Sequence, residues 1–556
     1  MAPLITLITG QLGLKKKDSL DKFVRFLGDK PEPKTCHCIF FENKLIEAYN
    51  EEMKYDSPEE TASLSKILGN PKSLLFKVWK PAAEKVAEEI ADNQDKDYIL
   101  VVMHATYYHL DTRSFSTFFN IWDIKNFFQP SQVITLVDDI IDIKNRKPGF
   151  FMSADIDEEI FWFMNILIWR EFEMNASISI ANHIGCKFSV LALRHRLQTL
   201  ADLLDGKESV YLSHSITEVK ARLQRNEDVF TGTELIGEVN ELYNGLTDSG
   251  IVAFSPTTID DLRFLRIKLN GEDLSLPIII PRWPSLDEGA ILWTKPPSNE
   301  VLKHKPVFDL KIPDELRERL TDNWSAADEI KTVIQKNVAE SEEDEGEGSG
   351  EYVNQLRSIG QLIKPLTSLI EDQINSRDVT LVSQASNIAA YRPIFAGNLA
   401  GGVDEEIRCF NALRKLDNSK YEKCFCFIAE KDIGNYPKRR LAHLARNSLV
   451  FEGKPSIEIL EQFTSEHFED IQTWDGLVEK AAGFRIEIKI LDIASDRTGV
   501  MRASDYSRRE HQWSEVVSKA KDWQHFLQGK DNVEIKILVQ EGGAPKQFCE
   551  TIVSEL

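Results

Sequence analysis

The sequence predicts an α/β protein with several domains, and two observations carry this prediction. Short apolar runs alternate with segments in which apolar residues recur at helical spacing, the pattern of parallel sheets covered by helices on both faces. The chain has 556 residues, too many for one hydrophobic core at roughly 150 residues per domain. We therefore expect two Rossmann-like, doubly wound parallel-sheet domains and a small C-terminal α/β region.

The first domain is expected at residues 1–205. Its opening run LITLITG (4–10) predicts a strand, and KKKDSLDKFVRFLG (15–28) predicts a helix. The run IFWFMNILIW (160–169) falls short of the ~18 apolar residues that span a bilayer, so it predicts a buried helix. Four further apolar runs predict the remaining strands: CHCIFF (36–41), YILVVMHA (98–105), SQVITLVDDI (131–140) and CKFSVLAL (186–193).

A second α/β domain is expected at residues 206–435. Its acidic stretch ESEEDEGEGSGE (340–351) has like charges and no long apolar side chains to bury, which predicts a flexible surface insertion at about 338–351. Helices are expected at about 233–248, at 352–376 and from 404 onward. The strands are expected in SVYLSHSIT (209–217), GIVAFSP (250–256), LPIIIPRWP (276–284, strand or loop), SNIAAYRP (386–393) and KCFCFIAE (423–430).

The remaining residues, 436–556, are expected to form a C-terminal α/β appendage. Two runs in this region, RIEIKILDI (485–493) and NVEIKILV (532–539), alternate apolar and polar residues and predict strands.

Charge and cysteine content exclude several classes of protein. The 67 Lys and Arg residues against 89 Asp and Glu give a net charge of −22, which argues against nucleic acid as a main partner. Seven scattered cysteines, an odd number, indicate reduced thiols and a cytoplasmic location. The pairs Cys36-His-Cys38 and Cys424-Phe-Cys426 lack a second ligand pair nearby, so we expect no metal there. Without a signal peptide or a spanning run, no membrane partner is expected.

A damaged phosphate-binding loop follows the first strand. In such loops glycines free backbone N–H groups for the phosphates, and a lysine neutralises their charge. Gly10, Gly13 and Lys16 are the candidate nucleotide-binding residues. Lys15 replaces the second motif glycine, and Lys17 replaces the hydroxyl that holds magnesium.

The segment around this loop resembles nucleotide kinases of the adenylate-kinase type within the P-loop family. The likeness also rests on VVMHA (101–105), TLVDDIIDIKNR (135–146) and IWREFEMNASISIANHIG (168–185). It implies a nucleotide at the first domain, although no cofactor is certain. The departures favour a fold kept for binding or scaffolding over an active phosphotransferase. Asp138 and Asp139 either hold metal or are simply solvated.

A second motif carries carboxylates at an expected strand-to-helix loop, GGVDEEI (401–407). Cleavage of a nucleoside N-glycosidic bond needs a carboxylate at the anomeric carbon and a group that assists the departing base. A glycine loop at the end of a strand lets the backbone approach a sugar, so this segment suits that chemistry.

Three segments resemble the nucleoside deoxyribosyltransferase family and its nucleotide N-glycosidase relatives. V-Y-L-S-H-S-I-T (210–217) is similar to the family's opening I-Y-L-A-G-P-I-T, R-D-x-x-L-V (377–382) precedes the next strand, and G-V-x-x-E-I (402–407) resembles the family's G-x-x-x-E-[IL] helix start. The resemblance implies that Glu406 is the nucleophile, that Asp378 contacts the sugar or leaving base, and that Tyr211 orients Glu406. On its own, Glu406 would be a first-turn acidic residue that stabilises its helix.

Four more residues complete the expected substrate site. Ser213 and Gly402 lie within the two motifs and are expected to bind substrate. His214, which replaces the family's glycine, either contacts a phosphate or the base or is merely exposed. Arg392 either anchors a phosphate or pairs with an acid.

The resemblances imply an enzyme that cleaves the base–sugar bond of a nucleotide, NAD or a deoxynucleotide, by hydrolysis or by transfer. By analogy with multidomain bacterial defence effectors, they also imply a regulated role in antiviral defence, with a protein regulator or oligomer as partner. The alternatives are a non-catalytic nucleotide-binding sensor or scaffold, and a nucleotide kinase-like protein.

Overall fold

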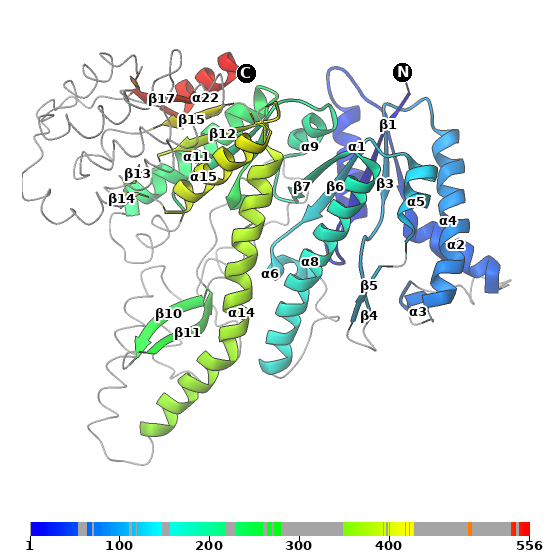
Figure 1. The fold of residues 1–556 in the computed structure, drawn as a ribbon, viewed down its shortest axis with the longest axis horizontal. Helices are drawn as coiled ribbons and strands as arrows, with labels where there is room; N and C mark the ends of the chain where they lie inside the picture. The colour runs from blue at the N-terminus through cyan, green and yellow to red at the C-terminus, as the bar shows by residue number, and fades with distance from the viewer. Residues whose placement is uncertain are drawn as a thin grey trace, which may run out of the picture. The chain divides into compact units, whose positions relative to one another are not determined.

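The structure is a computed structural model and consists of two compact units, each built around a parallel sheet (Figure 1). Unit 1 comprises Met1–Gly206 and Thr258–Arg377, and unit 2 comprises Lys207–Thr257 and Asp378–Leu556. The predicted α/β class is confirmed at this level. The residues that the structure describes are 2–53, 64–68, 70, 72–109, 114–117, 119–146, 156–216, 229–259, 264–269, 272–279, 349–392, 394–395, 398–399, 401–417, 419–421, 423–427, 488–491, 535–540 and 544–556.

The sheet of unit 1 has five parallel strands in the order β2-β3-β1-β6-β7. All five coincide with predicted apolar runs, and β3 and β6 are buried along their whole length, as central parallel strands should be. The strands are β1 (Leu4–Thr9), β2 (Cys36–Phe40), β3 (Tyr98–Val102), β6 (Gln132–Val137) and β7 (Lys187–Ala192).

The helices of unit 1 bury their apolar stripes against this sheet. A single core cluster joins α2 (Phe41–Met53), α4 (Lys72–Asp92) and the end of α8 (Ile156–Ile184) to alternate residues of β1 and β3. The buried leucines of α1 (Lys16–Gly28) lie outside that cluster. Shorter elements are α3 (Leu64–Leu68), the hairpin β4 (Tyr107–His109) and β5 (Ser114–Ser116), α5 (Ile121–Asp123), the π-helical turn η2 (Ile124–Phe128), α6 (Ile140–Arg146) and α9 (Leu197–Leu204).

The long apolar run at 160–169 lies inside α8, where most of its side chains are buried. This outcome confirms the predicted buried helix. Among the residues described, no helix is both long enough and apolar enough to cross a membrane.

The sheet of unit 2 has six parallel strands in the order β16-β17-β15-β12-β8-β9. The two C-terminal runs expected in an appendage form β16 and β17, and β17 pairs directly with β15. Both therefore extend the sheet that includes the strand before the carboxylate motif. The strands are β8 (Ser209–His214), β9 (Val252–Phe254), β12 (Asn387–Tyr391), β15 (Cys424–Phe427), β16 (Ile488–Leu491) and β17 (Ile535–Gln540).

Three helices of unit 2 concern the site: α11 (Val229–Asp248), α15 (Gly401–Leu416) and α22 (Ala544–Glu555). α22 packs closely on α11, because a Cβ added to Gly245 would lie 2.9 Å from Sγ of Cys549. The connection between β12 and α15 contains a small hairpin of β13 (Ile394–Phe395) and β14 (Asn398–Leu399), and a 3-10 turn, η3 (Pro256–Thr258), follows β9.

Two elements of the middle region differ from prediction. Residues 276–279 of the run expected as strand or loop lie in strand β11 (Glu272–Ile279), which begins four residues before the run and pairs antiparallel with the unpredicted strand β10 (Phe264–Leu269). Residues 280–284 of the run lie outside the described residues. The helix expected at 352–376 is α14 (Ser349–Gln384), which continues eight residues further because buried positions keep helical spacing through Gln373, Arg377 and Leu381. Most of the acidic stretch, residues 340–348, lies outside the described residues.

Candidate functional site

The side chain of Glu406 is held by two hydroxyl groups of strand β8. Tyr211 Oη donates to Glu406 Oε1 at 2.6 Å, and Ser213 Oγ donates to Glu406 Oε2. Tyr211 and Ser213 are two residues apart, so both side chains leave β8 on the same face, and both are completely buried. Each carboxylate oxygen thus has its own fixed donor.

Local sequence explains why Glu406 reaches these hydroxyls. Val403, Ile407 and Phe410 are buried at helical spacing and anchor α15 on the sheet. Glu406 lies within this apolar stripe, so its side chain points at the sheet and is only partly accessible. On the sheet, Ser213 pairs in register with Ala390, whose small side chain leaves room for the helix.

α15 begins at Gly401, three residues before the predicted start. Glu406 therefore lies in the second turn of the helix. This position argues against the simple alternative of a first-turn acidic residue, because the effect of the helix dipole fades beyond that turn.

His214 lies on the opposite face of the sheet from Ser213. Side chains alternate along a strand, and His214 pairs in register with Tyr391, whose hydroxyl donates to Glu238 of α11 at 3.1 Å. His214 is buried, which corrects the expectation of an exposed loop residue. Burial lowers the pKa of His214 to about 3, so the imidazole is neutral at physiological pH.

Arg392 follows β12 and pairs with an acid, one of its two expected alternatives. Its fully buried guanidinium donates to Glu238 Oε2 at 2.6 Å. Its backbone has a φ of 46°, the left-handed conformation that a non-glycine residue adopts at a cost. Such strain is maintained only where the surroundings fix the residue, and here the Arg392 N–H donates to the Phe427 carbonyl at 2.8 Å.

Two predicted residues lie at other places in unit 2. Asp378 is half-buried on α14, about two turns before the helix ends, rather than after the helix, which was expected to end at about residue 376. Gly402 is exposed in the first turn of α15, and a Cβ added there would meet no atom within 4 Å. The structure thus brings Tyr211 and Ser213 onto Glu406, joins Arg392 to Glu238, and places His214 beside Tyr391 on the other face of the sheet.

The glycine loop of unit 1 is filled by protein side chains. Gly10 and Gly13 have φ values of 146° and 92°, and Lys15 also takes the left-handed conformation, with a φ of 48°. A Cβ on Gly10 would lie 2.7 Å from Leu14 Cδ1 and 2.8 Å from the Leu136 carbonyl oxygen, and one on Gly13 would lie 2.9 Å from Ile143 of α6. Close packing around positions 10 and 13 therefore explains why glycine occupies both.

Lys16 is directed at main-chain carbonyls. Its ammonium group donates to the carbonyl oxygens of Gly10 and, at 3.1 Å, of Met103. The residue as a whole is partly accessible. Burial lowers the pKa of Lys16, and the nearby carboxylates of Glu42 and Glu173 act against this shift.

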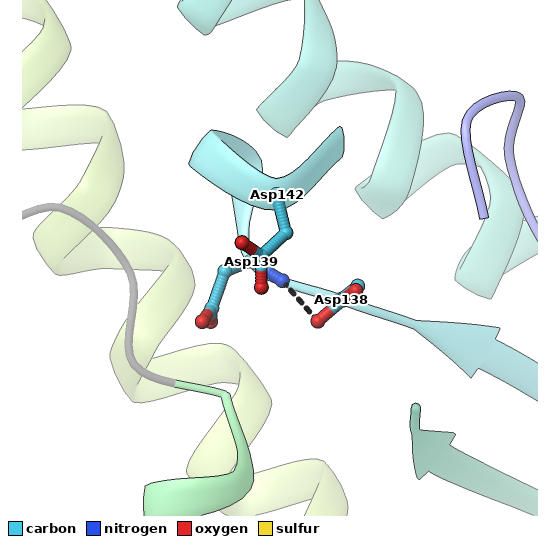
Figure 2. Close-up of side chains that lie close together, drawn as sticks. All are labelled: Asp138, Asp139 and Asp142. Atoms are coloured by element: carbon cyan, nitrogen blue, oxygen red, sulfur yellow. Dashed lines mark hydrogen bonds between the residues drawn. The ribbon is translucent and has the colours of Figure 1, made fainter. Parts of the chain in front are cut away.

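The acidic residues that follow β6 form a charge-paired cluster with two arginines. Carboxylate oxygens of Asp138, Asp139 and Asp142 lie within 4.8 Å of one another (Figure 2). Arg146 pairs with Asp138, and Arg194 lies 2.8 Å from Asp139 and 3.3 Å from Asp142. Asp138 and Asp139 are buried rather than solvated, and burial raises the pKa of Asp138 although Arg146 opposes it. The guanidinium groups of Arg146 and Arg194 balance the negative charge of the three carboxylates, as a bound metal ion would.

Some of these contacts were missed by the sequence interpretation. Ser213 was assigned to substrate binding, although its two-residue spacing from Tyr211 already indicated the same face. Glu238 was not singled out, and no local pattern links it to Arg392, 154 residues away. Arg146 and Arg194 were likewise not identified.

No protein-family model matches this sequence, and no curated protein matches it significantly.

Proposed function

We propose that unit 2 is a nucleotide N-glycosidase or deoxyribosyltransferase-type enzyme with Glu406 as its catalytic carboxylate. The observation that carries this proposal is the contact of both Glu406 oxygens with hydroxyls of one strand, Tyr211 at 2.6 Å and Ser213. Two hydroxyl donors favour the ionised carboxylate and fix its orientation, which are the properties required of a nucleophile at an anomeric carbon.

The position in the fold also supports this role. In open parallel sheets, ligands bind beyond the carboxyl ends of the strands. Ser213 lies one residue before the end of β8, and the connection to α15 leaves the same end of β12. On one face of the sheet, Tyr391 donates a hydrogen bond to Glu238 of α11. On the opposite face, Tyr211 donates to Glu406 of α15. Helices on both faces suit a doubly wound, Rossmann-like domain, as also proposed for unit 1.

In the proposed reaction, Glu406 attacks or electrostatically stabilises the anomeric carbon while the bond to the base breaks. Tyr211 and Ser213 hold the carboxylate in place as the sugar develops positive charge. Asp378 is proposed to contact the sugar or the departing base. Water or a second base then takes the sugar, which distinguishes hydrolysis from transfer.

The proposed substrate is NAD or a deoxynucleotide, and the proposed setting is a regulated bacterial defence effector in the cytoplasm with a protein regulator or oligomeric partner. Among the described residues, Arg392 is already neutralised by Glu238. A substrate phosphate would therefore have to compete with the partly buried carboxylate of Glu238 for this guanidinium. We therefore propose that Arg392 fixes the backbone at the end of β12 and does not bind substrate.

A non-catalytic sensor or scaffold role is the second candidate, and it applies best to unit 1. Leu14 and Ile143 fill the space around the loop glycines, and Lys16 binds main-chain carbonyls. The lysine ammonium that would receive phosphates is thus used within the protein, and apolar side chains pack against the loop, so these contacts weigh against a kinase activity.

The direct test is release of free base from NAD and from a panel of nucleotides and deoxynucleotides, followed by chromatography. Wild-type protein should release base from one substrate class, and Glu406→Gln should lower the rate by roughly 10³-fold or more. Glu405→Gln is the matched control, because the side chain of Glu405 is exposed on the preceding position of the same helix. Absence of release from every substrate, or release that persists in Glu406→Gln, would contradict the proposal.

A further inference from the structure

Four hydrogen-bond donors of unit 1 converge on one buried carboxylate, that of Glu173 on α8. The Gly10 N–H donates to Oε1 at 2.8 Å, and the Ala105 N–H donates to the same oxygen at 2.7 Å. The N–H and the hydroxyl of Thr106 both donate to Oε2 at 2.7 Å. Glu173 is 1% exposed, so these protein donors surround it in place of water.

The donors come from two loops that would otherwise have unpaired backbone groups. Gly10 follows β1 and the pair Ala105-Thr106 follows β3, and these neighbouring strands pair only as far as Ile8 and Val102. Beyond the last ladder bond, buried N–H groups need another acceptor. Glu173 provides it and ties both loops to α8.

The arrangement has the composition of an anion site. Backbone N–H groups from a glycine loop, a hydroxyl and a nearby ammonium are the groups that hold carboxylates and phosphates in proteins. The ammonium is that of Lys16, which interacts electrostatically with Glu173 and Glu42. Here the anion belongs to the chain itself.

We infer that unit 1 contains a carboxylate-sized anion site and that the side chain of Glu173 occupies it. The four donors are therefore satisfied without a nucleotide phosphate. A phosphate brought to the same donors would meet the negative charge of Glu173 in a poorly solvated space, where like charges repel strongly. This inference concerns unit 1 and does not depend on the proposed activity of unit 2.

Chemical rescue tests it. Glu173→Ala removes the carboxylate and leaves the four donors facing a cavity that formate fits. Thermal unfolding is measured in sodium formate and in sodium chloride of equal ionic strength. At a formate concentration ten times its Kd, the midpoint of Glu173→Ala should rise by about 2 °C relative to chloride. The wild type and the control Glu171→Ala, altered on the same helix, should show no difference between the salts.

A second arm uses ATP as the probe. Any ATP-dependent rise in the midpoint of the wild-type protein should persist in Lys16→Ala, because it would come from unit 2 and not from the site that Glu173 fills. A rise that is lost in Lys16→Ala would overturn the inference, as would a folded Glu173→Ala protein with no preference for formate.

If Glu173→Ala does not fold, the hydroxyl donor decides. Thr106→Val keeps the shape of the side chain and removes one donor, and it should lower the unfolding midpoint. Thr106→Ser keeps the hydroxyl and should retain more of the stability than Thr106→Val. Equal midpoints for wild type and Thr106→Val would show that the contact with Glu173 does not hold the loops.

Discussion

The phenolic oxygen of Tyr211 lies 2.6 Å from Oε1 of Glu406, although 195 residues separate the two in the chain. Parallel strand pairing puts Tyr211 beside Ile388 of β12, and β12 leads into the helix that carries Glu406. The contact therefore depends on the whole arrangement of β8, β12 and α15, and its removal should affect catalysis more than folding.

Tyr211→Phe should lower kcat for base release by about 10- to 100-fold, the value of one hydrogen bond to a charged group. KM should change little, because the hydroxyl contacts the carboxylate rather than the substrate. Tyr421→Phe is the control, since Tyr421 is also buried and donates to a main-chain carbonyl of Ser383 at 2.7 Å. Steady-state kinetics would contradict the assignment if both variants lost activity equally.

Ser213→Ala should lower kcat by about 10-fold, because Glu406 Oε2 loses its donor. The loss should be smaller than additive in the Tyr211→Phe background, since both hydroxyls act on one carboxylate. Ser209→Ala, at the other end of β8, serves as the control. Strictly additive losses would indicate that the two hydroxyls act independently.

His214 should make unit 2 less stable as the pH falls. Its pKa is about 3 in the folded protein, because burial disfavours the charged imidazole, against about 6.5 when unfolded. The unfolded chain therefore binds the proton first, so stability is full above pH 6.5 and declines below it. From pH 7.5 to 5.5 the free energy of unfolding should fall by about 1.4 kcal/mol through this histidine. Urea unfolding at both pH values would show whether His214→Gln loses that part of the dependence.

Gly10→Ala and Gly402→Ala should have opposite consequences. An alanine Cβ at Gly10 would approach the Leu136 carbonyl oxygen to 2.8 Å at a φ of 146°, so the free energy of unfolding should fall by about 2 kcal/mol or more.

Gly402 faces open space within a helix, so Gly402→Ala should raise the free energy of unfolding by up to ~1 kcal/mol. A higher KM in stable Gly402→Ala would support approach of the α15 backbone to the sugar, and an unchanged KM would argue against it.

The strands of the two parallel sheets and the helices α1, α8, α11, α14 and α15 could be predicted because their patterns are local. Short apolar runs predict β1, β3 and β12, and the helical spacing of apolar residues after Lys15 predicts α1. The end of α14 was missed because Val379, Thr380 and Val382 favour extended structure, whereas tertiary burial of Arg377 and Leu381 keeps them helical. Strand β10 was missed because its pattern becomes informative only with β11 beside it.

The contacts between distant residues were harder to predict. The position of His214 follows from strand alternation once Tyr211 is placed, so the sequence contained that information. The pairing of β17 with β15 does not follow from either strand alone, because many strands could accept the same hydrogen bonds. The role of Glu173 was not predicted because nothing in the sequence of α8 distinguishes it from the other acidic residues of that helix or points to the two loops it joins.

Glu406 lies on a helix that packs against the sheet of unit 2, and β17 and α22 complete this part of the structure. The ribosome synthesises both long after β8. β17 pairs with β15, and Phe548 of α22 packs on Tyr391 and Phe427, whose rings are stacked with centroids 4.9 Å apart. During synthesis, β8, β12 and α15 therefore emerge before the strand and helix that complete their support. The activity proposed for unit 2 should therefore require β17 and α22, because the sheet under α15 is incomplete until they are made.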